Sequence, residues 1–402
     1  MGLTGGVWMA RIPAAKSQVH LSDGTLGLAL FAVPVGLVIG AALAERLVDR
    51  AGSTLLVRIC GVGNCVAAVT PGFARGLPEL MAALFAIGAS GGILDVATNA
   101  QGVRVEAAYG RPVMTSMHAF YSLGAILGSL AGGAFAWAGV ALLPSLAVID
   151  VAGVVIDGTA GYWLLPAAPR PAVASSALSE PDPGDSPSAP SGASAAEHSA
   201  RARKRVRRLV LALGVLGVCA LVGEGAAGDW SAVYLRDNLG ASAGFAALGF
   251  AAFSVTMTLG RGVGDRLIHR FGVVSVIRVC GLIATAGLAL ALATSVPAVA
   301  IAGFTAFGAG LSIVVPQVFA AGGRADPLRP GSGLAKVVGL GYTGMAAGPA
   351  IIGLVASKIG LHLALLIPVV LAAWIAVAAP ALRTPEDRAH ARRPLPATRS
   401  SA

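Results

Sequence analysis

The sequence predicts an all-α membrane protein built from two six-helix bundles. Three observations lead to this prediction. The mean hydropathy of the 402 residues is +0.78, and only 12% of them are charged, a smaller charged share than soluble domains carry. Apolar segments of about 20 residues, the length that crosses a bilayer as a helix, recur along the whole chain. The second half of the chain also repeats the first half.

The repeat is clearest between residues 45–61, ERLVDRAGSTLLVRICG, and residues 265–281, DRLIHRFGVVSVIRVCG. The two stretches lie 220 residues apart and are identical at seven positions. The same offset aligns Gly124 with Gly344 farther along the chain. Parallel repeats of this kind pack about an axis along the membrane normal and hold the substrate between the halves.

The apolar segments give the expected helices, whose ends are uncertain by a few residues. They lie at about 25–47, 53–73, 78–102, 113–138 and 140–165, and then at 209–235, 242–264, 272–294, 297–320, 332–356 and 361–383. Before residue 25 the apolar part ends near Ile12, which is too short to span a bilayer. We therefore expect the first of twelve helices to be truncated, with a native start farther upstream.

These segments define the expected domains. Residues 1–165 form the N-terminal bundle and residues 209–383 the C-terminal bundle. Residues 166–208 are rich in Pro, Ser and Ala and end in a basic cluster, which is typical of a disordered linker. Residues 384–402 form a polar tail.

Basic residues orient the chain. With residues 45–61 placed in the cytoplasm, 24 of the 29 Lys and Arg residues fall inside, as the positive-inside rule requires. We therefore expect a cytoplasmic C-terminus and explain the net charge of +10 by topology rather than by nucleic acid. The four cysteines lie in apolar segments without metal-ligand spacing, and no phosphate loop or nucleophile motif is present. The sequence thus predicts no enzyme activity, no cofactor and no metal.

The charged loop after the second helix carries a family resemblance. Asp49, Arg50 and Gly52 fit the Gly-x-x-x-Asp-Arg-x-Gly signature of the major facilitator superfamily, although Glu45 replaces its first glycine. The chain resembles this transporter family over essentially its whole length, which implies alternating access between two bundles. The resemblance also implies a cytoplasmic gate made of Asp49, Arg50, Gly52, Asp265, Arg266, Arg270 and Gly272.

One branch of the family is more similar than the rest. The fourth helix, GASGGILDVATNAQG, resembles the acidic motif of fucose-permease-like sugar:proton symporters, and Asp95 and Asn99 match its carboxylate and amide. The second acidic residue of those symporters, in the first helix, corresponds here to Met9. The fifth helix resembles the antiporter signature of drug exporters, but Ser129 replaces its proline. The resemblance implies uptake of a sugar-like solute with protons.

Ionisable side chains within the hydrocarbon are costly, so each is a candidate for function. At ~1.5 Å per residue Asp95 and His118 reach similar depths, so we expect them to pair as a proton carrier, and Glu224 is a further candidate. A helix-packing role for these residues stays open, as it does for the remaining acidic side chains. The residues that the resemblance places in the substrate cavity are Asn99, Tyr121, Gln317 and Tyr342.

Three other residues have a structural interpretation. Asp150 and Asp157 share one face of the sixth helix, where hydrogen bonds between helices are the favoured explanation. Trp230, beside Asp229, is expected to anchor the outer membrane interface.

The sequence therefore predicts a proton-coupled secondary transporter for a small polar solute such as a sugar. A drug or metabolite exporter using proton antiport is the alternative, and a non-transporting membrane sensor is a third possibility. The expected partners are the solute, protons and the bilayer, without nucleic acid. We expect a monomer with many membrane passes in a bacterial inner membrane.

Overall fold

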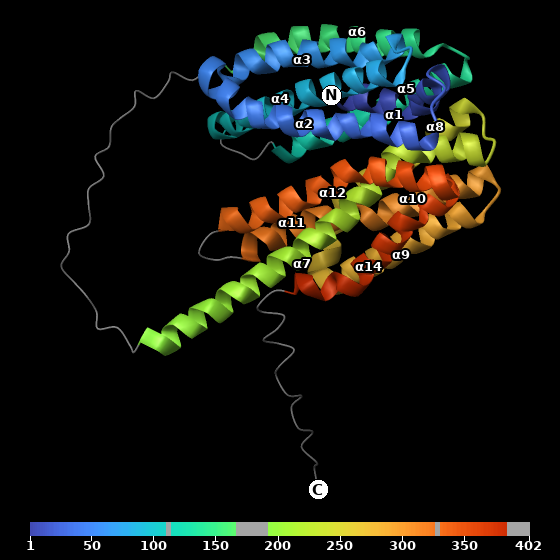
Figure 1. Ribbon diagram of the computed structural model, residues 1–402. Helices are drawn as coiled ribbons and strands as arrows, with labels where there is room; N and C mark the ends of the chain where they lie inside the picture. The colour runs from blue at the N-terminus through green and yellow to red at the C-terminus, as the bar shows by residue number, and fades with distance from the viewer. Residues whose placement is uncertain (110–113, 166–191, 326–329, 384–402) are drawn as a thin grey trace.

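The computed structural model describes residues 1–109, 114–165, 192–325 and 330–383, and every regular element in these ranges is helical. Eleven helical segments in these ranges are long and apolar enough to cross a membrane. Figure 1 shows two layers of helices, one from the first part of the chain in blue to teal and one from the second part in green to red. The predicted all-α membrane fold of two bundles is confirmed.

The first layer holds α1 (Gly2–Gln18), α2 (Asp23–Ala51), α3 (Ser53–Val69), α4 (Leu77–Tyr109), α5 (Met114–Trp137) and α6 (Leu142–Ala160). Two short 3₁₀ turns, η1 (Thr70–Phe73) and η2 (Gly161–Trp163), end α3 and α6. With 17 residues, α1 is not among the eleven membrane-length segments.

The second layer holds α7 (Gly192–Val233), the π-helical turn η3 (Tyr234–Asn238), α8 (Ala243–Phe271), α9 (Val273–Ala293), α10 (Pro297–Leu311), α11 (Val314–Ala325) and α12 (Pro330–Ile359). It ends with α13 (Leu361–Ala364), α14 (Leu366–Ala378) and the 3₁₀ turn η4 (Ala379–Leu382). Together, α10 and α11 make one membrane-length segment.

The linker prediction needs a correction at its C-terminal end. Residues 192–208, expected to be disordered, are the beginning of α7. Their sequence is rich in Ala and Arg, which are strong helix formers, and they extend a helix that the membrane segment already nucleates. Residues 166–191 and the tail 384–402 lie outside the described residues.

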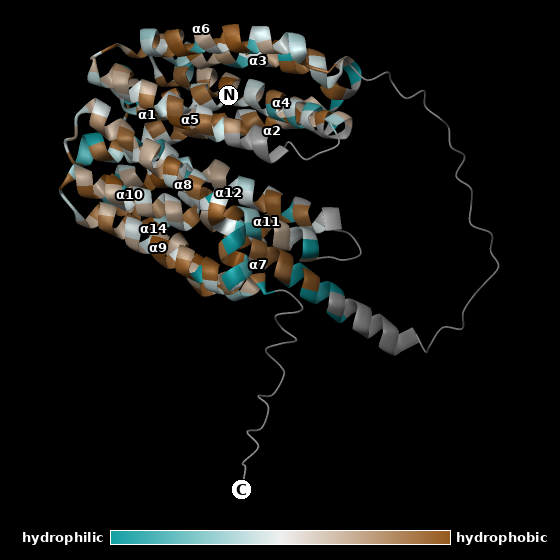
Figure 2. Cartoon of the chain, turned by 180° about the vertical axis from the view of Figure 1, so that it is seen from behind, coloured by the Kyte–Doolittle hydropathy of each residue, from teal (hydrophilic) through white to brown (hydrophobic). Residues whose placement is uncertain are grey.

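Apolar side chains cover the outer faces of the bundle. Val151 on α6 and Val377 on α14 are 62% and 66% exposed, and Figure 2 shows apolar residues in brown along most of the helices. A water-soluble protein rarely exposes continuous apolar surface on this scale. These faces suit contact with lipid.

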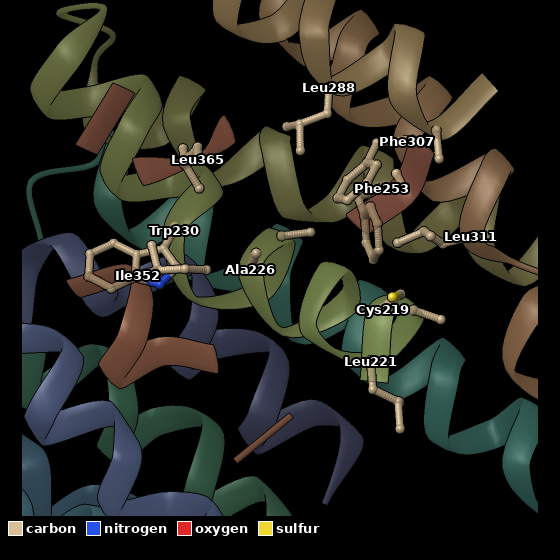
Figure 3. Packing of buried hydrophobic residues seen from close by; sticks show 14 of the residues in the cluster. Cys219, Leu221, Ala226, Trp230, Phe253, Leu288, Phe307, Leu311, Ile352 and Leu365 are labelled. Atoms are coloured by element: carbon tan, nitrogen blue, oxygen red, sulfur yellow. The ribbon is translucent and has the colours of Figure 1, made fainter. Parts of the chain in front are cut away.

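The core of the second layer is aromatic. The rings of Phe253 on α8 and Phe307 on α10 lie 5.8 Å apart, and Figure 3 shows them packed with Leu311 above Cys219 of α7. Trp230 is fully buried in the same cluster. The expectation that Trp230 anchors the membrane interface is wrong, because this residue faces the neighbouring helices rather than the headgroups.

The two layers meet at one end, which we call the closed end. There α2 approaches α12 so closely that a Cβ on Gly353 would lie 2.7 Å from the Cα of Gly27. On the other side of the bundle α5 approaches α8, where a Cβ on Gly244 would lie 2.6 Å from that of Trp137. Glycine is required at such approaches because the backbones leave no room for a side chain.

The opposite end carries the loops that follow α2 and α8, and we call it the basic end. Gly52 and Gly272 join α2 to α3 and α8 to α9 with φ angles of 79° and 78°. This matching geometry is the structural counterpart of the sequence repeat.

Candidate functional site

A cavity of about 240 Å³ lies between the layers. Helices from both layers line it: α1, α2, α3, α4 and α5 from the first, and α7 and α12 from the second. Most of the lining is apolar. Its polar and aromatic side chains are Thr4, Trp8, Asn64, Tyr121 and Asp229.

Asp95 and Asn99 lie one turn apart on α4. The Asn99 amide donates to the Asp95 carboxylate at 3.2 Å and to the Asp95 carbonyl oxygen at 3.0 Å. Asp95 also lies within electrostatic range of Tyr121 on α5 and of Tyr342 on α12. Residues of both layers therefore face Asp95. The side chain of His118 lies outside the described residues, so its pairing with Asp95 stays a prediction.

Glu224 on α7 faces Arg261 on α8. The Arg261 guanidinium Nη2 lies 3.4 Å and 3.5 Å from the two carboxylate oxygens of Glu224. Tyr342 of α12 is within electrostatic range of the Glu224 carboxylate. The sequence interpretation missed Arg261 because it counted this arginine with the basic residues at the end of the helix.

Pro316 explains how Arg261 is held. A proline has no N–H, so it leaves the carbonyl four residues earlier without its helical donor, and that carbonyl belongs to Ser312. The helix breaks there between α10 and α11, and the Arg261 Nε donates to the Ser312 oxygen at 3.4 Å. The break in the helix thus supplies an acceptor that orients the guanidinium toward Glu224.

Four of these side chains occupy one depth in the bundle. Asp95, Tyr121, Arg261 and Tyr342 each lie 16 to 18 residues from the closed end of their own helix, which is roughly 25 Å at the helical rise. Two belong to each layer. These four side chains form a polar layer between the two halves, closer to the basic end than to the closed end, and Glu224 contacts it through Arg261.

Gln317 lies on α11, the helix whose Phe319 packs beside Tyr342 of the polar layer. Gln317 is half-buried on α11. The ring of Tyr342 lies 6.5 Å from that of Phe319, also on α11.

Asp229 is the charged side chain of the cavity that sequence reasoning did not select. It lies one turn beyond Gly225 on α7 and lines the same cavity as Trp8 of α1. Its position beside Trp230 suggested an interfacial residue. The five-residue spacing from Glu224 to Asp229 gave no signal, because it places the two carboxylates about 140° apart around the helix.

The expected gate residues lie at the basic end. Asp265, Arg266 and Arg270 are exposed near the end of α8, where Arg270 covers the ring of Phe271 at 5.3 Å. Within the part of the chain that the structure describes, these three side chains form no ion pair. Arg50 is exposed at the end of α2, and the side chain of Asp49 lies outside the described residues.

An ion-pair cluster joins the layers at the closed end. The Lys16 ammonium lies 2.6 Å from a carboxylate oxygen of Asp23 on α2 and 2.6 Å from one of Asp237 in η3. Asp237 belongs to the second layer, so Lys16 bridges the two halves. Sequence reasoning missed this bridge because Lys16 and Asp237 are 221 residues apart.

Comparison with known proteins supports the fold throughout the chain. A sequence profile of the Major Facilitator Superfamily matches residues 1–321 and, in a second match, residues 226–401. The uncharacterized transporter y4wD of Sinorhizobium fredii is 32% identical over 382 residues, which are 95% of each chain.

Two solved structures share the fold. The nucleoside transporter NupG aligns with a TM-score of 0.68 at 13% identity, over 95% of this chain and 96% of that one. The D-xylose-proton symporter aligns with a TM-score of 0.67 at 15% identity, over 94% and 93%.

Proposed function

Because the chain belongs to the Major Facilitator Superfamily, we propose that it carries a small polar solute across the membrane by alternating access, coupled to protons. The observation that carries this proposal is the polar layer between the two halves. Asp95 and Tyr121 belong to one half, and Arg261 and Tyr342 to the other, so a solute held there contacts both. Movement of one half against the other then changes the side from which that solute is reached.

The arrangement of the two ends supports alternating access. Backbone contacts such as Gly27 with Gly353 and the Lys16 cluster hold the closed end together. At the basic end Asp265 and Arg266 are exposed, and no ion pair joins them to the other half among the described residues. If the basic end is cytoplasmic, as the distribution of Lys and Arg favours, this is an inward-facing state with a cytoplasmic C-terminus.

Proton coupling is supported by carboxylates at the polar layer. The charge of Glu224 is balanced by Arg261 at 3.4 Å, so a proton on Glu224 would release the guanidinium for another partner. Asp95 accepts from Asn99, and its ionisation inside the membrane segment is costly enough to favour a functional role. His118 remains a candidate beside Asp95.

A sugar-like solute suits the neutral polar groups of the layer. The amide of Asn99 and the hydroxyls of Tyr121 and Tyr342 can hydrogen-bond to several hydroxyl groups. The two transporters of shared fold are named for a nucleoside and for D-xylose, which both contain a sugar. The relative y4wD is bacterial, and an inner-membrane location follows in the proposal.

The test is solute-driven proton flux in proteoliposomes that contain a trapped pH dye. We expect one sugar or sugar-like compound to acidify the interior, and Asp95→Asn to abolish this flux. Asp157→Asn is the matched control, because Asp157 faces Cys65 of α3 rather than the polar layer. Alkalinisation on adding a drug would mean antiport instead. A solute flux without any proton movement would contradict the coupling.

A further inference from the structure

The cavity at the closed side of the polar layer contains a carboxylate, that of Asp229, without a partner among the described residues. Asp229 is the only charged side chain among the described residues that line it. In the part of the chain that the structure describes, this carboxylate has no hydrogen bond and no ion pair, and it lies within electrostatic range of no charged group. Asp229 is half-buried, and an ionised carboxylate inside a membrane-spanning bundle is costly unless a cation or a donor meets it.

Among the described residues, the nearby Lys and Arg side chains contact other groups; Arg11 of α1, for example, donates to the Val140 carbonyl at 2.6 Å. Arg261 is engaged by Glu224, and Lys16 is engaged by Asp23 and Asp237 at the closed end. The cavity lining contains no Lys, Arg or His among the described residues. The amino terminus acts on Asp150 and Cys65 rather than on Asp229.

The rest of the lining suits an organic cation. Trp8 of α1 and Tyr121 of α5 border the same cavity as Asp229, and the faces of aromatic rings attract a cationic group within about 6 Å of the ring centre. Met9 and Met345 add polarisable, apolar walls. A site that only accepts a proton needs neither aromatic walls nor a volume of about 240 Å³.

We propose that Asp229 binds a protonated amino group of the transported solute, and that the substrate is a small hydroxylated amine. This inference rests on the proposed transport function and narrows its substrate class. The amine meets Asp229 between the rings of Trp8 and Tyr121, while the hydroxyl groups of the same solute face the polar layer. Asp229 is thus a specificity-determining residue.

The test compares binding within three matched pairs of solutes. The pairs are D-glucosamine with D-glucose, D-galactosamine with D-galactose, and ethanolamine with ethylene glycol, so that an ammonium replaces one hydroxyl in each. Binding is measured at pH 7 by the thermal shift of the purified full-length protein. A charged hydrogen bond contributes roughly 1.5–3 kcal/mol, so we expect at least one amine to bind about tenfold or more tightly than its neutral partner.

Variants assign this preference to Asp229. In Asp229→Asn, the affinities for the two members of that pair are expected to differ by about twofold or less. Asp229→Glu keeps the carboxylate and is expected to keep most of the preference for the amine. Asp157→Asn makes the same chemical change in a membrane helix away from the cavity, and it is expected to keep the wild-type ratio. Size-exclusion chromatography shows whether each variant is folded.

Two results would overturn the inference. One is an equal response of the wild type to both members of every pair, no response included. The other is a preference for the amine that persists in folded Asp229→Asn. The proposed transport function has a separate readout, which is solute-driven proton flux. If a neutral solute drives this flux but no amine is preferred, the transport function stands and the amine site is refuted. Intact amine binding without any solute-dependent flux would refute transport and leave the amine site.

Discussion

The Lys16 cluster predicts how the closed end opens. Lys16 forms two ion pairs of equal length, but only the pair with Asp237 joins the two halves, while the pair with Asp23 stays inside the first half. Asp237→Asn therefore removes a contact that only the closed state makes. Asp23→Asn removes a similar contact from the same lysine without breaking the bridge, and it is the matched control.

The size of the effect follows from exposure. The side chains of Lys16 and Asp237 are 15% and 37% exposed, so water and salt weaken the pair to about 0.5–1 kcal/mol. Losing this energy from the closed state changes the ratio of closed to open molecules roughly two- to fivefold, since about 1.4 kcal/mol corresponds to a factor of ten.

Spin labels measure this ratio directly. Cysteines that replace His20 and Asn238, exposed residues on opposite halves at the closed end, carry the labels after the four native cysteines are removed. Pulsed dipolar spectroscopy then gives the distribution of distances between the halves. We expect Asp237→Asn to increase the longer-distance population and Asp23→Asn to change it less. An effect of Asp23→Asn equal to or larger than that of Asp237→Asn would refute the reasoning.

Three further predictions concern the ion pair, the core and a turn. A double-mutant cycle of thermal unfolding with Glu224→Gln and Arg261→Gln measures the coupling free energy of this pair. We expect about 0.5–1 kcal/mol, because both side chains are partly exposed. A coupling of zero would mean that the pair is not formed. Trp230→Ala should destabilise the protein by about 3–5 kcal/mol, seen as a lower melting temperature, since its fully buried indole would leave a cavity. Gly272→Ala should lower the free energy of unfolding by about 1–2 kcal/mol, because Gly272 has a φ of 78°. A Cβ on Gly262 of α8 would meet open space, so Gly262→Ala should leave the free energy of unfolding unchanged or raise it.

The sequence alone determined the membrane fold of this protein. Hydropathy can be read directly from the order of residues along the chain. Because the bilayer requires every spanning segment to satisfy its own backbone hydrogen bonds, apolar segments long enough to cross it are expected to be helices. The repeat at an offset of 220 residues further indicated two similar halves. The boundary at Gly192 was missed because the basic segment before α7 is polar but still has high helix propensity.

The candidate site needed the tertiary structure. Asp95 and Tyr342, or Lys16 and Asp237, are more than 200 residues apart, and no local pattern states that helices of different halves bring them together. Sequence patterns also could not separate Asp229, which lines the cavity, from Trp230 beside it, which is buried in the core. Adjacent residues on a helix point about 100° apart, so the packing of the neighbouring helices decides which of the two faces a solute.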